Sequence, residues 1–209
     1  HVVCKQTVLN DPIDGQFYST IPGKMTNKLA TFLLRQKSLG PKSRFAPWFA
    51  IMPSTFESPV FFSEAEMELL RGDSIFTEAT RLRQEYVSDY AAIARILAAD
   101  PARFPPGSFD FETYRWARHM IESRAWHLRG DQYFVPQADF FNHQQHKSQT
   151  YEKEPDTRGE FFLAHHKAYG DRVEVLADRD CAEGSQVWET YGDNTNSIFF
   201  MYHGFIPDT

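Results

Sequence analysis

Apolar residues recur at helical spacing through the first half of the chain. The longest stripe runs from Ile75 to Leu97, with apolar side chains three or four positions apart, and it stops at Asp100-Pro101. This spacing predicts one amphipathic helix that packs one face on a core. A shorter stripe within residues 26–36 predicts another helix, with its apolar face formed by Leu29, Phe32 and Leu33.

Two more helices are predicted from local signals. Ser63 and Glu66 have the capping-box spacing, in which each side chain satisfies a backbone N–H of the first turn. Residues 110–124 place apolar side chains on one helical face, and this helix should end within the stretch SRAW. The prolines at positions 41, 47, 53 and 59 predict turns between the helices.

After Gly130 the pattern changes to short strand-like runs separated by turn residues. Strands are predicted at 132–135, 160–164, 172–176 and 186–191, and the polar segment 146–159 is predicted to be a solvated loop. No obvious linker separates the two halves. The prediction is therefore an α+β fold, with a mostly-β core in the second half and a helical insertion forming most of the first half.

Composition narrows the class of protein. The 209 residues are 42% hydrophobic and 15% aromatic, which is enough to fill a sizeable core. A net charge of −6 argues against nonspecific nucleic-acid binding, so no nucleic-acid partner is expected. No apolar run approaches the roughly 20 residues of a membrane span, so no membrane partner is expected. Cys4 and Cys181 are too few for a disulfide scaffold, which favours reduced thiols and an intracellular protein.

The stretch VPQADFFNHQQH carries the first candidate site. A strand ending at Pro136 should deliver Asp139, Asn142 and His143 to a turn, where an amide and an imidazole could bind the edge of a flat heteroaromatic ligand. The alternative is a structural turn whose side chains satisfy its own backbone, and the frequencies of turn residues favour that alternative.

The sequence also contains residue types that occur in metal centres and in hydrolases. The cluster of His143, His146, His165, His166 and Asp139 contains residue types that bind zinc, but its spacing matches no zinc motif, so no metal is expected. There is no G-x-S-x-G elbow, and the surroundings of Cys181 predict a turn between strands rather than an activated thiolate.

Two single residues could also belong to a site. Arg124, in SRAW, could bind a carboxylate with two hydrogen bonds or could simply complement the dipole of its helix. Tyr191 is predicted at the end of a strand that stops at Gly192, a usual place for a site residue, but an ordinary core tyrosine fits the same pattern. Periodicity does not choose between these alternatives.

Taken in order, several segments resemble the SET-domain methyltransferases, in the branch of the Rubisco large-subunit and actin-histidine methyltransferases. The most specific feature is a pair of motifs that lie about fifty residues apart. The first motif is Asn-His and the second is Tyr-Gly…Asn…Gly-Phe. The matching segments are WFAIMPSTFESPVFF (48–62), YRWARHMIESRAW (114–126), VPQADFFNH (135–143) and AEGSQVWETYGDNTNSIFFMYHGFI (182–206).

The resemblance implies a function and a site. Members of this family transfer a methyl group from S-adenosylmethionine to a lysine or histidine nitrogen of a protein substrate. By the resemblance, Tyr191 is the catalytic residue at the channel, and the cofactor is bound by Arg124, Asp139, Asn142 and His143. The substrate channel would be lined by Trp126, Tyr202, His203 and Phe205.

The resemblance also implies a division of the chain. Residues 1–25 would be an N-terminal remnant of a longer SET N-terminus, 26–126 the inserted helical region and 127–209 the C-terminal half of the SET core. Residues 1–25 do not match the glycine-containing turn that opens the family's domain. The C-terminal segment should thread beneath a loop, burying Phe199, Phe200 and Phe205.

One position departs from the family's pattern. His203 stands where lysine-modifying members often have a tyrosine, with Tyr202 one residue earlier, so the sequence leaves the choice between lysine and histidine open. The same departure leaves room for an alternative of another class, a catalytically inactive SET-like module that binds a protein partner. The sequence sets no expectation for the oligomeric state.

Overall fold

The computed structural model describes residues 2–128, 130–144, 161–169, 172–177, 180, 182–192 and 194–207. The predicted loop at 146–159 and the predicted turn at Cys181 lie outside these residues. In the first half the order is α1 (Lys5–Leu9), α2 (Gly15–Thr20), α3 (Met25–Ser38), η1 (Gly40–Lys42), α4 (Ala46–Phe49), η2 (Pro59–Phe61), α5 (Glu64–Leu69), α6 (Ser74–Ala98) and α7 (Phe111–Arg124).

The second half carries the strands. They are β1 (Trp126–Leu128), β2 (Asp131–Tyr133), β3 (Asn142–His143), β4 (Phe161–Tyr169), β5 (Arg172–Ala177) and β6 (Val187–Glu189). A short 3-10 turn, η3 (Ala138–Phe140), precedes β3, and the chain continues into α8 (Asn196–Ile198) and one turn of π-helix, η4 (Phe199–His203). This arrangement confirms the predicted α+β class.

All four helices predicted from the sequence are present, and their ends follow the local signals. The Ser63 side chain accepts from the backbone of Glu66, and Glu66 reaches back to the backbone of Ser63, which completes the capping box of α5. Asp110 caps α7 by accepting a hydrogen bond from the backbone N–H of Thr113 at 2.8 Å. Each cap satisfies an N–H that a helix start leaves without a partner.

The helices in residues 1–25 and at 196–203 were not predicted. They are too short for an apolar period to show, and they are held instead by tertiary packing. Val8 on α1 and Tyr18 on α2 are fully buried in the same core as α3 and α7.

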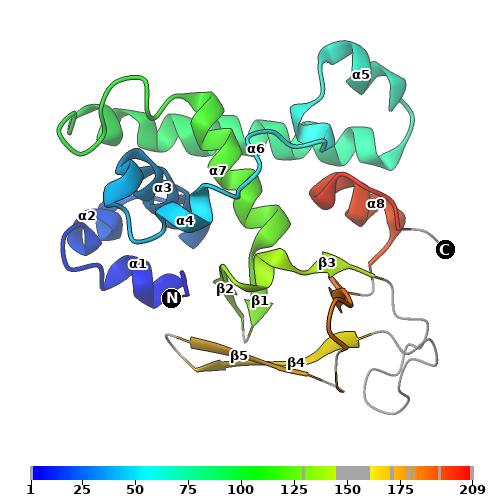
Figure 1. Ribbon diagram of the computed structural model, residues 1–209. Helices are drawn as coiled ribbons and strands as arrows, with labels where there is room; N and C mark the ends of the chain where they lie inside the picture. Colours follow the sequence, from blue (N-terminus) through cyan, green and yellow to red (C-terminus); the bar gives the residue numbers. More distant parts are fainter. Residues whose placement is uncertain are drawn as a thin grey trace.

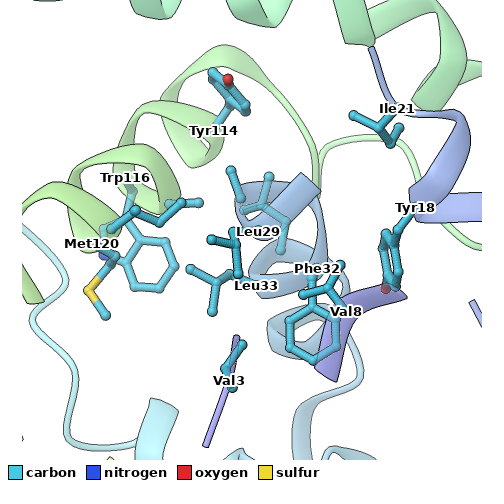
Figure 2. Packing of buried hydrophobic residues seen from close by; sticks show 14 of the residues in the cluster. Val3, Val8, Tyr18, Ile21, Leu29, Phe32, Leu33, Tyr114, Trp116 and Met120 are labelled. Carbon is cyan, nitrogen blue, oxygen red and sulfur yellow. The ribbon is translucent and has the colours of Figure 1, made fainter. Parts of the chain in front are cut away.

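The main hydrophobic core lies between α3 and α7. Figure 2 shows Leu29, Phe32 and Leu33 of α3 on one side and Tyr114, Trp116 and Met120 of α7 on the other. A second cluster forms where η2, α5 and α6 meet the C-terminal segment, and it contains Val60, Met67, Ala79, Leu82, Tyr86 and Met201. In this way α6 and the C-terminal segment share buried surface.

The described strands form two sheets. β1 and β2 make an antiparallel hairpin, and the second sheet has the order β3-β6-β4-β5. β3 pairs in parallel with β6, with Asn142 opposite Trp188 and His143 opposite Glu189. β4 also pairs in parallel with β6, whereas β4 and β5 form an antiparallel hairpin. In Figure 1, α7 runs from the helical part of the molecule down to the β1–β2 hairpin.

Several details of the strand predictions were wrong. β1 was not predicted, and β4 runs to Tyr169 instead of ending at Ala164. Asn142 and His143 lie in a strand rather than in a turn, because they pair with β6, a partner more than forty residues away in sequence. β6 ends at Glu189 instead of Gly192, because its two-residue partner β3 ends the ladder. Within the described residues, no helix is both long and apolar enough to cross a bilayer.

Candidate functional site

A pocket of about 650 Å³ opens where the end of α7 meets η3, the segment after β6, and η4. Both halves of the chain contribute to its walls. Seven of the nine predicted site residues line it: Arg124, Trp126, Asp139, Tyr191, Tyr202, His203 and Phe205. The volume lies within the range of about 300–1,000 Å³ that is typical of small-molecule sites.

Tyr191 lies just after β6 and is fixed by two hydrogen bonds. Its backbone N–H donates to Nδ1 of His143 at 3.1 Å, and its hydroxyl donates to the backbone carbonyl of Phe141 at 2.8 Å. Burial raises the pKa of Tyr191 to about 12, so the hydroxyl keeps its proton at neutral pH. Tyr191 is therefore a neutral, oriented side chain in the pocket wall.

His143 lies behind Tyr191 rather than in the pocket wall. Because Nδ1 accepts from Tyr191, the neutral imidazole carries its proton on Nε2. The ring centroid is 5.1 Å from that of Tyr191 and 4.6 Å from that of Phe199. Asn142 is exposed and does not line the pocket. A direct cofactor contact by Asn142 or His143 stays a prediction.

Asp139 is buried between a tryptophan and an arginine. The indole N–H of Trp48 donates to Oδ2 of Asp139 at 2.5 Å, and Nη1 of Arg124 lies 3.9 Å from Oδ1. Burial raises the pKa of Asp139 to about 6, against the opposing effects of Trp48 and Arg124. Arg124 ends α7, and its buried Nε has no hydrogen-bond partner among the described residues.

The predicted channel residues surround Tyr191 on the side of the C-terminal segment. The His203 ring centroid lies 4.9 Å from that of Tyr191 and 6.1 Å from that of Phe205. Burial, with a further contribution from His143, lowers the pKa of His203 to about 4, so this imidazole is neutral at pH 7. Tyr202 reaches α6, where its hydroxyl lies 3.5 Å from Oε1 of Glu78.

The C-terminal segment packs against the helical half of the chain, but its burial is uneven. Phe199 is 1% exposed, Phe200 is half-buried, and Phe205 is 36% exposed at the pocket, so the predicted burial of Phe205 was wrong. The hydroxyl of Ser58 donates to the carbonyl of Met201 at 2.6 Å. Gly204 has φ 78°, and a Cβ there would lie 3.0 Å from the carbonyl oxygen of Glu57. This close approach requires glycine.

Sequence reasoning missed His119 and Glu122, which also line the pocket from α7. The predicted apolar face of this helix was defined by Phe111, Tyr114, Ala117 and Ile121, and α7 is in fact buried on several sides from Trp116 to Ile121. A histidine within a mostly apolar helix was the available signal. Burial raises the pKa of Glu122 and lowers that of His119 to about 3.

Across the residues that the structure describes, no three His, Cys, Asp or Glu side chains are grouped so that they could hold a metal ion. His146 and the side chains of His165 and His166 lie outside that part of the chain.

Comparison with solved structures that have the same arrangement of helices and strands identifies the fold. The chain aligns over its whole length with 45% of the SET domain of LSMT bound to lysine and AdoHcy, with a TM-score of 0.81 at 21% identity. It aligns equally completely with 45% of Rubisco LSMT bound to AdoMet, with a TM-score of 0.79 at 20% identity. The chain has a SET-domain fold. The predicted resemblance is confirmed at this level.

Sequence comparison points to the same branch of SET-domain proteins. The chain is 25% identical over 205 residues to the actin-histidine N-methyltransferases of Gallus gallus and Homo sapiens, a match that covers 93% of this chain and 32% of each relative. No model of a known protein family matches the sequence. The SET-domain chain thus spans about a third of the length of these curated relatives.

Proposed function

We propose that this SET domain belongs to an S-adenosylmethionine-dependent protein N-methyltransferase acting on a lysine or histidine side chain. One observation carries the proposal: the two specific sequence motifs meet directly behind the pocket wall, where Tyr191 is fixed by hydrogen bonds to His143 and to the backbone of Phe141. The similarity to actin-histidine N-methyltransferases over 93% of the chain supports it.

The charges around the pocket fit such a cofactor. S-adenosylmethionine carries a carboxylate, an amino group and a positively charged sulfur. The buried Nε of Arg124 lacks a partner among the described residues and is a suitable donor to the carboxylate. The carboxyl groups of Glu122, Asp139 and Glu189 line the same pocket and can balance positive charge. We assign Arg124 and Asp139 to the cofactor on this basis.

Methyl transfer requires the protein mainly to position the reacting groups. When bound, the cofactor supplies a methyl group on a positively charged sulfur. The target nitrogen must be neutral and aligned with that methyl group. The wall formed by Tyr191, His203 and Phe205 is aromatic. Because the His203 imidazole is neutral at pH 7, it adds no positive charge that would repel the sulfonium. Tyr191 is the proposed catalytic residue through its contact with the reacting groups.

The first experiment measures cofactor binding. A thermal-shift titration with S-adenosylhomocysteine should raise the melting temperature, because a ligand that binds only the folded state stabilises it. Arg124→Met should weaken the shift, whereas Arg71→Met, on the exposed surface of the molecule, should leave it intact. No shift at millimolar ligand would refute the proposal.

The second experiment separates an enzyme from an inactive module that binds a protein partner. Transfer of a labelled methyl group to protein substrates, followed by mass spectrometry, should identify a modified lysine or histidine. Cofactor binding without transfer to any protein would favour the inactive module. An intracellular location belongs to the same proposal, since the two cysteines suggest a reducing compartment.

A further inference from the structure

Glu122 lies near the end of α7, two residues before Arg124, and its side chain lines the pocket. This side chain is 22% exposed, whereas that of Asp139, in the same pocket, is 6% exposed. Glu189 is buried and Glu57 is exposed. Glu122 is therefore a pocket carboxyl group that a ligand can reach and that water surrounds only in part.

The protein uses only part of the hydrogen-bonding capacity of this carboxyl group. Oε1 accepts from Nη2 of Arg118 at 3.5 Å, which is a long hydrogen bond. Arg118 bonds more closely to Asp89, and it donates to Oδ1 of Asn27 at 2.9 Å. Oε2 makes no hydrogen bond to any described residue, and it is not enclosed by the protein. Because a carboxylate offers about four acceptor positions, Oε2 can accept from a ligand.

Glu122 and Arg124 point to different sides of α7. Each helical residue turns the side chain by about 100°, so positions two apart diverge by about 200°. Arg124 reaches Asp139, with 3.9 Å between Nη1 and Oδ1. The charged and titratable groups that act on Glu122 are Arg118 of α7, Glu85 and Tyr86 of α6, His127 of β1 and Tyr202 of η4. Since His127 and Tyr202 also line the pocket, Glu122 lies between the α6–α7 interface and the pocket.

We propose that Glu122 accepts a hydrogen bond from an N–H group of the target side chain and so selects a basic side chain, lysine or histidine. This inference rests on the proposed methyltransferase function and adds a specificity-determining residue to it. Arg124 and Asp139, the groups assigned to the cofactor, pair with each other, which leaves Glu122 for the substrate. Its neighbour Tyr202 is one of the predicted channel residues.

A carboxylate in this place suits a basic target. A hydrogen bond from an N–H group to a charged acceptor is stronger than one between neutral groups. The target nitrogen becomes positively charged as it accepts a methyl group, and a carboxylate close by stabilises that charge. Burial raises the pKa of Glu122 while Arg118 opposes the rise, and a bound cation would oppose it further. The charged form of Glu122 is therefore favoured when a basic side chain is bound.

The N–H group can come from an amine or from an imidazole, and paired probes distinguish the two. The amine pair is L-lysine and L-2-aminoheptanoic acid, which has a methyl group in place of the terminal amino group. The imidazole pair is 4-methylimidazole and 4-methylthiazole, in which sulfur replaces the N–H group. Each probe is titrated at pH 8.5 with saturating S-adenosylhomocysteine, and its Kd is measured from NMR chemical shifts.

The N–H member of at least one pair should bind about tenfold or more tightly than its partner, the usual effect of a hydrogen bond to a charged group. The pair with the larger preference identifies the target class. Glu122→Gln keeps the shape of the side chain and an acceptor for Arg118 but removes the charge. It should reduce the preference by about fivefold or more and leave the affinity for the other member unchanged. Glu57→Gln, which removes the exposed carboxyl group of the pocket, should retain the preference.

Two outcomes would overturn the inference. One is equal or undetectable binding of both members of each pair by the unaltered protein. The other is a preference that persists in Glu122→Gln, or that Glu57→Gln reduces by the same amount. If Glu122→Gln fails to fold, Glu122→Asp replaces it, because this variant keeps the charge but withdraws the carboxylate by one carbon and should also reduce the preference.

Cofactor binding is scored separately from the preference for an N–H group. A melting temperature that S-adenosylhomocysteine does not raise counts against the proposed function. A raised melting temperature without any preference for the N–H members counts against Glu122 alone.

Discussion

The indole N–H of Trp48 donates to the carboxylate of Asp139 at 2.5 Å, joining residues that lie 91 positions apart in the sequence. Trp48 belongs to the helical half and Asp139 to the turn that precedes β3. The hydrogen bond therefore ties the pocket wall to the main core, in which Trp48 packs 5.4 Å from Phe134 between ring centroids.

Trp48→Phe should destabilise the protein in a pH-dependent way. It leaves a buried carboxylate without its donor, so unfolding at pH 7.5 should require about 1–3 kcal/mol less free energy. The pKa of Asp139 should rise above its value of about 6, because the hydrogen bond favours the charged form. Chemical denaturation at pH 7.5 and pH 5 measures the effect, which should shrink at pH 5 as the carboxyl group becomes neutral.

Trp116→Phe provides the matched control. The Trp116 indole donates to the uncharged carbonyl of Pro53 at 2.8 Å, so its loss should cost a similar amount at both pH values. If the two variants show the same pH dependence, Asp139 is not the group that responds to Trp48. The unaltered protein itself should lose stability from Asp139 as pH rises between about 4 and 6, since the folded state holds the proton more tightly there.

Tyr191→Phe should separate cofactor binding from methyl transfer. The variant loses the hydrogen bond from its hydroxyl to the carbonyl of Phe141, which should cost about 1 kcal/mol of stability. Because the backbone N–H still bonds to His143, the fold of the pocket should be kept. We expect kcat for labelled methyl transfer to fall about a hundredfold through misplacement of the reacting groups. Unchanged kcat would remove Tyr191 from the catalytic role.

Arg118→Met should be strongly destabilising. Arg118 is 1% exposed on α7 and is paired with Asp89, Glu85 and Glu122, so its removal leaves three carboxylates close together in a partly buried place. The expected loss is about 3–5 kcal/mol, measured by urea unfolding. Arg71→Met removes an exposed, solvent-screened pair with Glu68 and should cost much less stability than Arg118→Met. Equal costs for the two variants would show that the buried network does not hold α6 to α7.

His119 should make stability depend on pH in the acid range. Its folded pKa of about 3 lies below the value of 6.5 for an exposed histidine, so the unfolded chain binds the extra proton between these values and stability falls as pH drops. Between pH 7.5 and pH 5 this contributes about 2 kcal/mol. His119→Phe should therefore lose about 2 kcal/mol less than the unaltered protein across that interval.

Phe61→Leu is the control for this pH effect. It alters the packing against the His119 ring without removing a titrating group, so it should shift the stability by the same amount at both pH values. If the pH profiles of His119→Phe and the unaltered protein run parallel, the histidine is not buried in its neutral form. Denaturant midpoints measured at pH 7.5, 6 and 5 show whether the two pH profiles run parallel.

Local signals account for the parts of the fold that were predicted correctly. The α6 stripe, the α5 capping box and the end of α7 at Arg124 all depend on residues within one or two helical turns of each other. The short helices α1 and α2 were missed because five or six residues cannot display a helical period. Their position depends on the core formed with α3, which no local pattern encodes.

The sequence by itself determined the helical first half, the strand-rich second half and the two motifs that carry Tyr191 and His143. Only the tertiary structure decided that β3 pairs with β6, that Trp48 reaches Asp139 and that His119 lines the pocket. The tertiary structure also shows that Asn142 is exposed and does not line the pocket, although the sequence resemblance had assigned it, with His143, to cofactor binding. The physical reason is the sequence separation over which the interactions act. Helix periods and caps depend on residues that are close in the chain, whereas a pocket is assembled from the ends of elements that burial brings together.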